Sequence, residues 1–243
     1  MKAMIFAAGL GTRLKPLTDH MPKALVEVGG KPLLQHQLEK LRDAGAQSVV
    51  INVHHFADMI EQWVAAHPMG IDVQFSDERQ CLLETGGAIR HARPLLGKGR
   101  VLIHNCDILS NADLRAFYRD GEGAAATLLV SERRTSRYLL FDDEMNLRAW
   151  TNVTTGEVKY VPHVGHTPDV KSLHPFAFSG IHQIDSVAFP LMDTWPERFS
   201  VIDFYLHLAG SMKVKGVVNP ALRLLDVGKT DTLAEAEAFV NAL

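Results

Sequence analysis

The sequence has little of what marks several classes of protein. Among its 243 residues the only cysteines are Cys81 and Cys106, which excludes a disulfide framework and is typical of a reducing compartment. No apolar run approaches the roughly 20 residues that span a bilayer. The formal net charge is −3, whereas proteins that coat nucleic acids are normally strongly basic. We therefore expect a cytoplasmic protein that binds neither a membrane nor a nucleic acid.

Internal repeats, low-complexity tracts and linkers are also absent from the sequence. In its first half, short apolar runs alternate with helical patterns. Strands are predicted at residues 2–8, 48–53, 71–76 and 100–107, and helices at 32–44, 57–66 and 86–96, the last broken at Pro94. This alternation predicts a mostly parallel sheet with helices on both of its faces.

From Gly123 onward the pattern changes. Strands are predicted at 124–132, at 137–150 with a fold at 142–146, and at 176–184, and residues 151–175 are predicted to form a long loop or small ribbon. A helix at 201–210, a strand at 213–218 and a closing helix capped by Thr230 follow. We expect one α/β domain with a Rossmann-like, doubly wound, mostly parallel mixed sheet. Its parts are residues 1–122, a small inserted β-rich lobe at 123–185, and a closing α/β part at 186–243.

The segment GLGTRLKPLTDHMPKAL, from Gly9 to Leu25, follows a buried strand but carries two glycines, Arg13 and Lys23. A glycine-rich turn between a parallel strand and a helix leaves backbone N–H groups free to bind phosphate. The dinucleotide fingerprint is excluded because Leu14 stands where its third glycine belongs, and the P-loop because neither glycine precedes a lysine. A lone Gly-x-Gly is also typical of a tight turn with solvated charges, so both interpretations stay open at this point.

Two aspartates are candidate metal ligands. Asp107 ends a predicted parallel strand, where open α/β sheets bind ligands, and Asp226 precedes Gly228, which permits close backbone approach. Two carboxylates suit Mg²⁺, which takes one or two protein ligands together with substrate phosphates. Either aspartate alone is equally typical of a cap or a turn.

Glycines also begin a predicted helix in the ETGG segment at residues 84–87. Their bare backbone suits the edge-on approach of a flat base to the amides. The competing interpretation makes Thr85 the N-cap and places Glu84 near the helix dipole, and the two interpretations are compatible.

The string G-x-G-T-R-x-x-P-x-T, followed by Pro22 and Lys23, resembles the signature of the sugar nucleotidyltransferases. These enzymes join a nucleoside triphosphate to a sugar 1-phosphate and release pyrophosphate. LETGGAI at 83–89 is similar to the family's base-recognition segment, and NCD at 105–107 stands where the family has Gly-Asp. FSGIH at 178–182 resembles the sugar-facing strand, and LDVG at 225–228 the second metal-carboxylate motif. One departure is Cys106, which replaces a glycine of the family pattern.

The resemblance implies roles for individual residues. Arg13 and Lys23 become the catalytic cations, and Asp107 and Asp226 become ligands of a Mg²⁺ cofactor. The nucleotide is expected to contact Ala8, Gly9, Leu10, Gly11, Thr12, Arg13, Lys23, Glu78, Thr85, Gly86 and Gly87. The sugar 1-phosphate is expected to contact Asn105, Asn152, Ser179, Gly180 and His182. The first 122 residues then bind the nucleotide and the lobe at 123–185 binds the sugar, with Trp150 able either to stack on the sugar or to pack in the lobe.

The resemblance to short single-domain members favours UTP as donor and N-acetylmuramate 1-phosphate, or another amino-sugar 1-phosphate, as acceptor. A cytidylyltransferase for a small phosphorylated alcohol such as phosphocholine stays open, as does a non-catalytic nucleotide-sugar sensor. The sensor is disfavoured because binding alone does not need both cations and both carboxylates. A zinc site at His163, His166 and His174 is not expected, because the cluster has no cysteine or acidic partner. The sequence leaves the oligomeric state open, a homodimer included.

Overall fold

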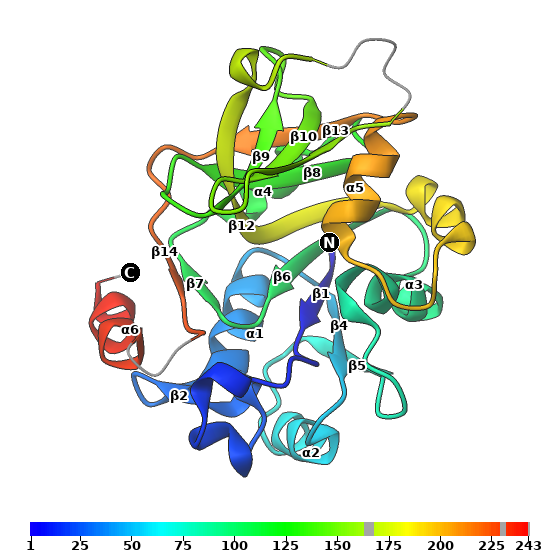
Figure 1. Ribbon diagram of the computed structural model, residues 1–243. Coiled ribbons are helices and arrows are strands. Elements are labelled where there is room, and N and C mark those ends of the chain that lie inside the picture. The colour runs from blue at the N-terminus through cyan, green and yellow to red at the C-terminus, as the bar shows by residue number, and fades with distance from the viewer. Residues whose placement is uncertain (163–167, 229–231, 243) are drawn as a thin grey trace.

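The computed structural model describes residues 1–162, 168–228 and 232–242. Its main sheet is centred on β1 (Lys2–Phe6), which pairs in parallel with β4 (Ser48–Val53) and with β6 (Arg100–Asn105). β5 (Asp72–Asp77) extends the sheet in parallel beyond β4, and β12 (His174–Asp185) runs antiparallel on the far side of β6. The α/β expectation and the mixed sheet are therefore confirmed (Figure 1).

Helices cover both faces of this sheet because alternate residues of each buried strand point to opposite sides. Ala3 and Ile5 of β1 pack with α1 (Leu33–Asp43) and α2 (Ala57–Ala66). Met4 packs on the other face, with α3 (Glu84–Leu96) and α5 (Val201–Ala209). Because successive side chains of β1 point to opposite faces, both faces of the sheet are apolar and both are covered by helices, which is the doubly wound arrangement.

The second half of the chain continues the sheet into the β-rich lobe, which occupies the upper part of Figure 1. The lobe strands are β8 (Ala126–Ser131), β9 (Arg137–Phe141), β10 (Leu147–Asn152) and β11 (Glu157–Tyr160), and β13 (Val214–Val218) pairs in parallel with β8. The fold predicted at 142–146 is the β9–β10 turn, and β11 forms the ribbon expected within 151–175. Because β12 pairs with both β6 and β9, one strand joins the two halves.

Short elements complete the fold. The strands are β2 (Glu27–Val28), β3 (Lys31–Pro32), β7 (Ile108–Ser110) and β14 (Leu224–Asp226), and the helices are α4 (Leu114–Asp120) and α6 (Thr232–Asn241). Turns of 3-10 helix are Thr12–Leu14, Leu17–Asp19, Lys23–Leu25, Val170–Ser172 and Ser186–Thr194. The predicted cap Thr230 lies outside the described residues. Within the described residues, no helix combines the length and apolarity needed to cross a membrane.

The expectation that the third helix breaks at Pro94 is wrong. α3 begins at Glu84 and continues through Pro94 to Leu96. Proline has no N–H to donate to the carbonyl of Arg90, four residues earlier in the helix. The Arg93 Nε donates to that oxygen instead, at 3.2 Å, so the helix continues.

Candidate active site

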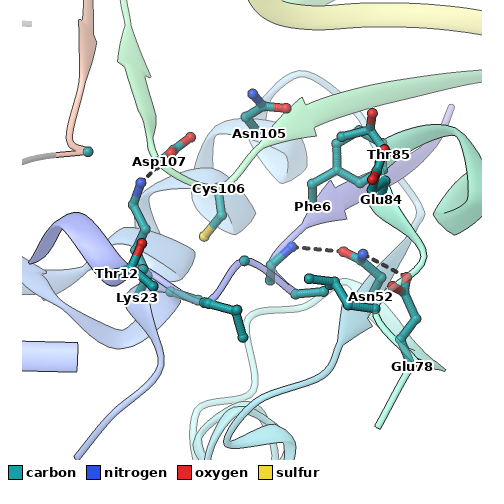
Figure 2. Close-up of a pocket in the computed structure, with 18 of the residues that line it drawn as sticks. Phe6, Thr12, Lys23, Asn52, Glu78, Glu84, Thr85, Asn105, Cys106 and Asp107 are labelled. Atoms are coloured by element: carbon teal, nitrogen blue, oxygen red, sulfur yellow. Dashed lines mark hydrogen bonds and ion pairs between the residues drawn. The ribbon is translucent and has the colours of Figure 1, made fainter. Parts of the chain in front are cut away.

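A cavity of about 460 Å³ lies at the carboxyl ends of the central parallel strands. Sheet register places Phe6, Asn52 and Asn105 side by side across β1, β4 and β6, and all three line the cavity. The other lining residues are Ala7, Ala8, Gly9, Leu10, Gly11, Thr12, Arg13, Lys23, Ala24, Glu78, Leu82, Glu84, Thr85, Cys106, Asp107 and Gly228. We call it the nucleotide cavity. It gathers the glycine-rich loop and both predicted cations at the edge of the sheet that binds ligands in open α/β folds. Figure 2 shows Lys23 and Asp107 on one side of the cavity and Asn52 and Glu78 on the other.

The glycine-rich loop is folded on itself before any ligand binds. Gly11 has φ +63°, and its carbonyl accepts hydrogen bonds from the Leu14 N–H and the Thr18 hydroxyl, both at 2.8 Å. A Cβ added to Gly11 would lie 2.9 Å from the Thr18 methyl and 3.1 Å from Lys23 Cβ. Gly11 therefore serves a tight turn, while residues 8 to 13 also line the cavity, so the two interpretations hold together.

Lys23 forms an ion pair with Asp107 at one end of the cavity, drawn as a dashed line in Figure 2. The two side chains are only 13% and 24% exposed. Lys23 enters from a 3-10 turn and Asp107 from the end of β6, so distant parts of the chain supply the pair.

Asp226 is brought to Asp107 by the pairing of β14 with β7. Asp226 lies level with Ile108, and the Val227 N–H donates to the Asp107 carbonyl at 2.9 Å. Desolvation raises the pKa of Asp226, and the negative charge of Asp107 raises it further, while Lys23 and Arg13 partly offset the rise in this pKa. The two carboxylates therefore repel one another, which is the condition that a cation between them relieves.

Gly228 lies against both Asp226 and Arg13. A Cβ at this position would lie 2.7 Å from Asp226 Oδ1 and 2.8 Å from Arg13 Nη2. A larger residue would therefore displace the ends of these two side chains. Close by, burial and the Asp107 charge raise the pKa of the Cys106 thiol well above its usual range, so this side chain stays neutral beside Asp107.

At the other end of the cavity, Glu78 is a buried organising residue and is only 2% exposed. Its carboxylate accepts hydrogen bonds from Asn52 Nδ2 at 2.8 Å and from the Leu83 N–H at 3.1 Å. Asn52 Oδ1 accepts in turn from the Ala7 N–H at 2.8 Å. Burial raises the pKa of Glu78, and these hydrogen bonds oppose the rise in its pKa. Glu78 thus connects three loops around the cavity, with Asn52 as a partner that the sequence analysis missed.

The structure does not bring Gly86 and Gly87 to the nucleotide cavity. Both N–H groups donate to the Phe199 carbonyl, at 2.8 and 3.3 Å. A Cβ on Gly86 would lie 2.4 Å from the Phe199 ring, and one on Gly87 would lie 2.5 Å from the Glu197 carbonyl. Gly86 and Gly87 therefore allow the segment at residues 197–199 to pack closely against α3. Close packing of a backbone requires glycine just as close approach of a ligand does, so the sequence alone does not distinguish the two.

Thr85 and Glu84 do line the cavity, but Thr85 is not the cap of its own helix. Its hydroxyl accepts from the Val201 N–H at 2.9 Å, at the start of α5, and the position that precedes α3 is Leu83. Glu84 adopts φ +61°, a left-handed conformation that costs a non-glycine residue free energy. Such strain is often found where a side chain or amide is aimed at a ligand.

Of the five residues expected at the sugar, only Asn105 lines the nucleotide cavity. Ser179 is buried and donates to the Leu129 carbonyl at 2.7 Å, and His182 is buried and hydrogen-bonded to the Tyr205 hydroxyl at 2.5 Å. Asn152 accepts from the Thr154 N–H in a turn. Gly180, with φ +75°, lets β12 approach Asn105, because a Cβ there would lie 2.7 Å from Asn105 Nδ2.

The histidine cluster gives no three-ligand site in the described part of the chain. His163 and His166 lie outside the described residues. His174 Nε2 lies 2.8 Å from Asp143 Oδ1 at the surface. Among the described residues, no group of three or more His, Cys, Asp or Glu side chains is placed to hold a metal ion.

A folded glycine-rich loop, two cations and two adjacent carboxylates at the end of a Rossmann-like sheet define a site for a phosphorylated nucleotide. Residues 2–138 match the nucleotidyl transferase family, and the chain belongs to this family.

Two relatives cover nearly the whole chain. N-acetylmuramate α-1-phosphate uridylyltransferase from Caulobacter vibrioides is 34% identical over 97% of this chain and 95% of its own length. The protein of that name from Neisseria meningitidis serogroup B is 33% identical over 100% of this chain and 99% of its own length. The solved structure of UDP-glucose pyrophosphorylase from Acinetobacter baumanii superposes with a TM-score of 0.78 over 98% of this chain and 92% of that one. At 16% identity, the last match shows a shared fold alone.

Proposed function

We propose that the protein transfers the uridylyl group of UTP to N-acetylmuramate 1-phosphate and releases pyrophosphate. The full-length similarity to two enzymes of that name supports this choice of substrates. The single observation that carries the chemistry is the Lys23–Asp107 ion pair in the nucleotide cavity, with Asp226 on the adjoining strand. Nucleoside triphosphates and sugar phosphates are cytoplasmic metabolites, so we assign the protein to the cytoplasm.

The reaction needs charge stabilisation more than proton transfer. The attacking sugar phosphate already carries an anionic oxygen, so no general base is required. The difficulty is to hold two polyanions in line while charge moves from the attacking oxygen to the leaving pyrophosphate. Backbone amides of residues 9 to 12 and the fork of Arg13 suit the triphosphate, and Lys23 suits the transferred phosphate as a point charge.

Asp107 and Asp226 fit a hard divalent cation. Burial raises the pKa of Asp226, and the negative charge of Asp107 raises it further in spite of Lys23 and Arg13, so a cation beside the two carboxylates would be favourable. They would hold Mg²⁺ together with substrate phosphates, and the bound ion would supply charge that offsets the negative phosphates. Lys23 is then free to leave Asp107 for the phosphate that is transferred.

The test is an incubation with each nucleoside triphosphate, each member of a panel of phosphorylated acceptors, and Mg²⁺, followed by measurement of pyrophosphate. We expect the fastest release with UTP and N-acetylmuramate 1-phosphate, and loss of release when the metal is chelated. Fastest release with CTP and phosphocholine would replace the proposed function by the cytidylyltransferase. Tight binding of nucleotide sugars with no pyrophosphate from any pair would identify a sensor.

A further inference from the structure

A second cavity, of about 300 Å³, lies in the β-rich lobe, and the residues named so far leave it without a role. We call it the lobe cavity. Arg133, Arg137 and Lys159 line it together with Trp150, Phe178 and Asp203. Aromatic faces suit the apolar faces of a sugar ring, and an excess of cations suits an anion. The lining therefore has the composition of a site for an anionic sugar.

The lobe cavity and the nucleotide cavity share a wall. Phe6 of the nucleotide cavity contacts the His182 ring, with centroids 6.0 Å apart, and His182 contacts Phe178 of the lobe cavity at 5.6 Å. The hydrogen bond from Val201 to Thr85 makes a second connection, since Thr85 lines one cavity and Ser200 the other. The buried His182 ring is therefore the layer between the two cavities.

Arg133 lies on the Phe178 side of the lobe cavity. Its Nη2 donates to the Phe178 carbonyl at 3.3 Å, and the Phe178 ring contacts His182, which separates the two cavities. Arg137 also lines the lobe cavity and is the first residue of β9, which pairs with β10.

The cations of the lobe cavity are not all neutralised. Lys159 Nζ lies 2.8 Å from Asp203 Oδ1 and 5.2 Å from the centroid of Trp150, so its charge is already satisfied. Within the part of the chain that the structure describes, the guanidinium groups of Arg133 and Arg137 have no ion pair. Two guanidinium charges of the lobe cavity are therefore available to an anionic ligand.

We propose that the lobe cavity binds a sugar 1-phosphate that carries a second anionic group, with Arg133 toward the phosphate and Arg137 on a carboxylate of the sugar. This inference rests on the proposed function and deepens it. N-acetylmuramate differs from N-acetylglucosamine by a lactyl ether that ends in a carboxylate, a group that the planar fork of arginine binds in a bidentate manner. Arg137 is then the residue that distinguishes the two sugars.

The experiment compares kcat/KM for N-acetylmuramate 1-phosphate and N-acetylglucosamine 1-phosphate at saturating UTP and Mg²⁺. The variants are R137Q, R137K and, as matched control, R134Q, which alters a neighbouring exposed arginine outside the lobe cavity. We expect the wild-type ratio to favour the muramyl substrate. R137Q should reduce this ratio roughly 10- to 100-fold, as for loss of a hydrogen bond to a charged group, R137K by less, and R134Q not at all.

Each outcome decides a different point. A wild-type ratio near one, or a ratio that R137Q and R137K leave unchanged, overturns the assignment of Arg137 while the proposed function stands. A fall of equal size in R134Q would show that the general charge of the loop is responsible, and it also overturns the assignment. Wild-type enzyme that turns over neither sugar phosphate overturns the proposed function itself. Circular dichroism of each variant separates misfolding from lost recognition, and the milder R137K keeps the test valid if R137Q does not fold.

Discussion

At the scale of residues, two cations and two carboxylates lie close together: Arg13, Lys23 and Asp107 line the nucleotide cavity, and Asp226 adjoins Asp107 outside this lining. Lys23 and Arg13 only partly offset the negative charges of Asp107 and Asp226. A triphosphate would bring several further negative charges, so the proposed reaction needs added positive charge at the reacting phosphates. Loss of a carboxylate from this set should therefore reduce turnover without reducing stability, whereas loss of a cation should reduce turnover with no gain in stability.

Lys23→Ala should reduce kcat roughly 10²–10³-fold, because a donor aimed at developing charge is lost, and should change the KM for UTP much less. Steady-state kinetics with each substrate varied in turn measure the effect. The matched control is Lys15→Ala, which alters a lysine of the same loop that is exposed and pairs only with Asp19. Retention of more than about half of the wild-type kcat would remove Lys23 from the proposed role.

Asp226→Asn should leave the ligand-free protein as stable as wild type or more stable at neutral pH. The folded protein raises the pKa of Asp226, so ionisation costs the folded state free energy at every pH above the unfolded pKa of about 3.9. The cost is absent in more acid solution, where the carboxyl is protonated in both states. Thermal unfolding at neutral and at acid pH measures this difference, and activity assays should show a raised Mg²⁺ requirement. A large loss of Tm would instead make Asp226 a structural turn residue.

At the scale of elements, the functional geometry depends on short pieces that connect long ones. β7 and β14 place Asp226 beside Asp107, and the Phe199 carbonyl holds the start of α3 against the beginning of α5. The contact between α3 and Phe199 is so close that only glycine fits at Gly86. Disruption of this contact should therefore destabilise the protein without removing any group that binds substrate.

Gly86→Ala should destabilise the protein by about 1–3 kcal/mol, as expected when an added methyl group forces packed atoms apart. The new Cβ would meet the Phe199 ring at 2.4 Å and its carbonyl at 2.9 Å. Urea denaturation measures the change. Gly9→Ala is the control, because no atom lies within 4 Å of its added Cβ. Unchanged stability in Gly86→Ala would show that Phe199 moves aside easily and does not hold the helix.

Sequence patterns predicted the long elements and failed at the short ones for a physical reason. A buried strand such as β4 is a run of mostly apolar residues, and this run is enough to predict the strand from the sequence. β7 and β14 have three residues each, too few for any periodicity, and they form because they pair with one another. The pairing of Asp107 with Asp226 was therefore predicted from family resemblance and not from the pattern of the chain.

Site residues divide in the same way. The loop residues 8–13, Asn105 and Asp107 line the cavity because they lie at or just beyond the ends of parallel strands, which sequence can locate, and Lys23 enters from a 3-10 turn. Ser179 and His182 are polar residues in a strand, and their partners at Leu129 and Tyr205 are distant in the sequence. Polarity alone does not tell whether such a group meets a ligand or a buried acceptor. Asn52 did leave a signal, a lone amide within the apolar run SVVINV.

At the scale of the whole molecule, β12 connects the two halves and carries a buried histidine between the two cavities. His182 contacts Phe6 on one side and Phe178 on the other. Burial lowers the pKa of His182 to about 3, and burial likewise lowers the pKa of His104, on the adjacent strand, to about 4. Both rings are neutral in the folded protein throughout the physiological range, so the wall between the cavities carries no charge.

This arrangement should make the protein acid-sensitive. An unfolded histidine takes up a proton near pH 6.5, whereas the folded protein resists protonation of His182 until about pH 3 and of His104 until about pH 4. Between these limits the unfolded state binds more protons, so stability decreases as the pH decreases, by up to about 1.4 kcal/mol per pH unit for each histidine.

The variant His182→Gln tests this pH dependence. Its side chain cannot titrate but can still hydrogen-bond Tyr205, so the free energy of unfolding of the variant should decrease less steeply as the pH decreases. Urea denaturation between neutral pH and about pH 5 measures the slopes, with His20→Ala, an exposed histidine, as the control that keeps the wild-type slope. Parallel curves for wild type and His182→Gln would mean that water enters the shared wall and that the folded protein binds the proton there after all.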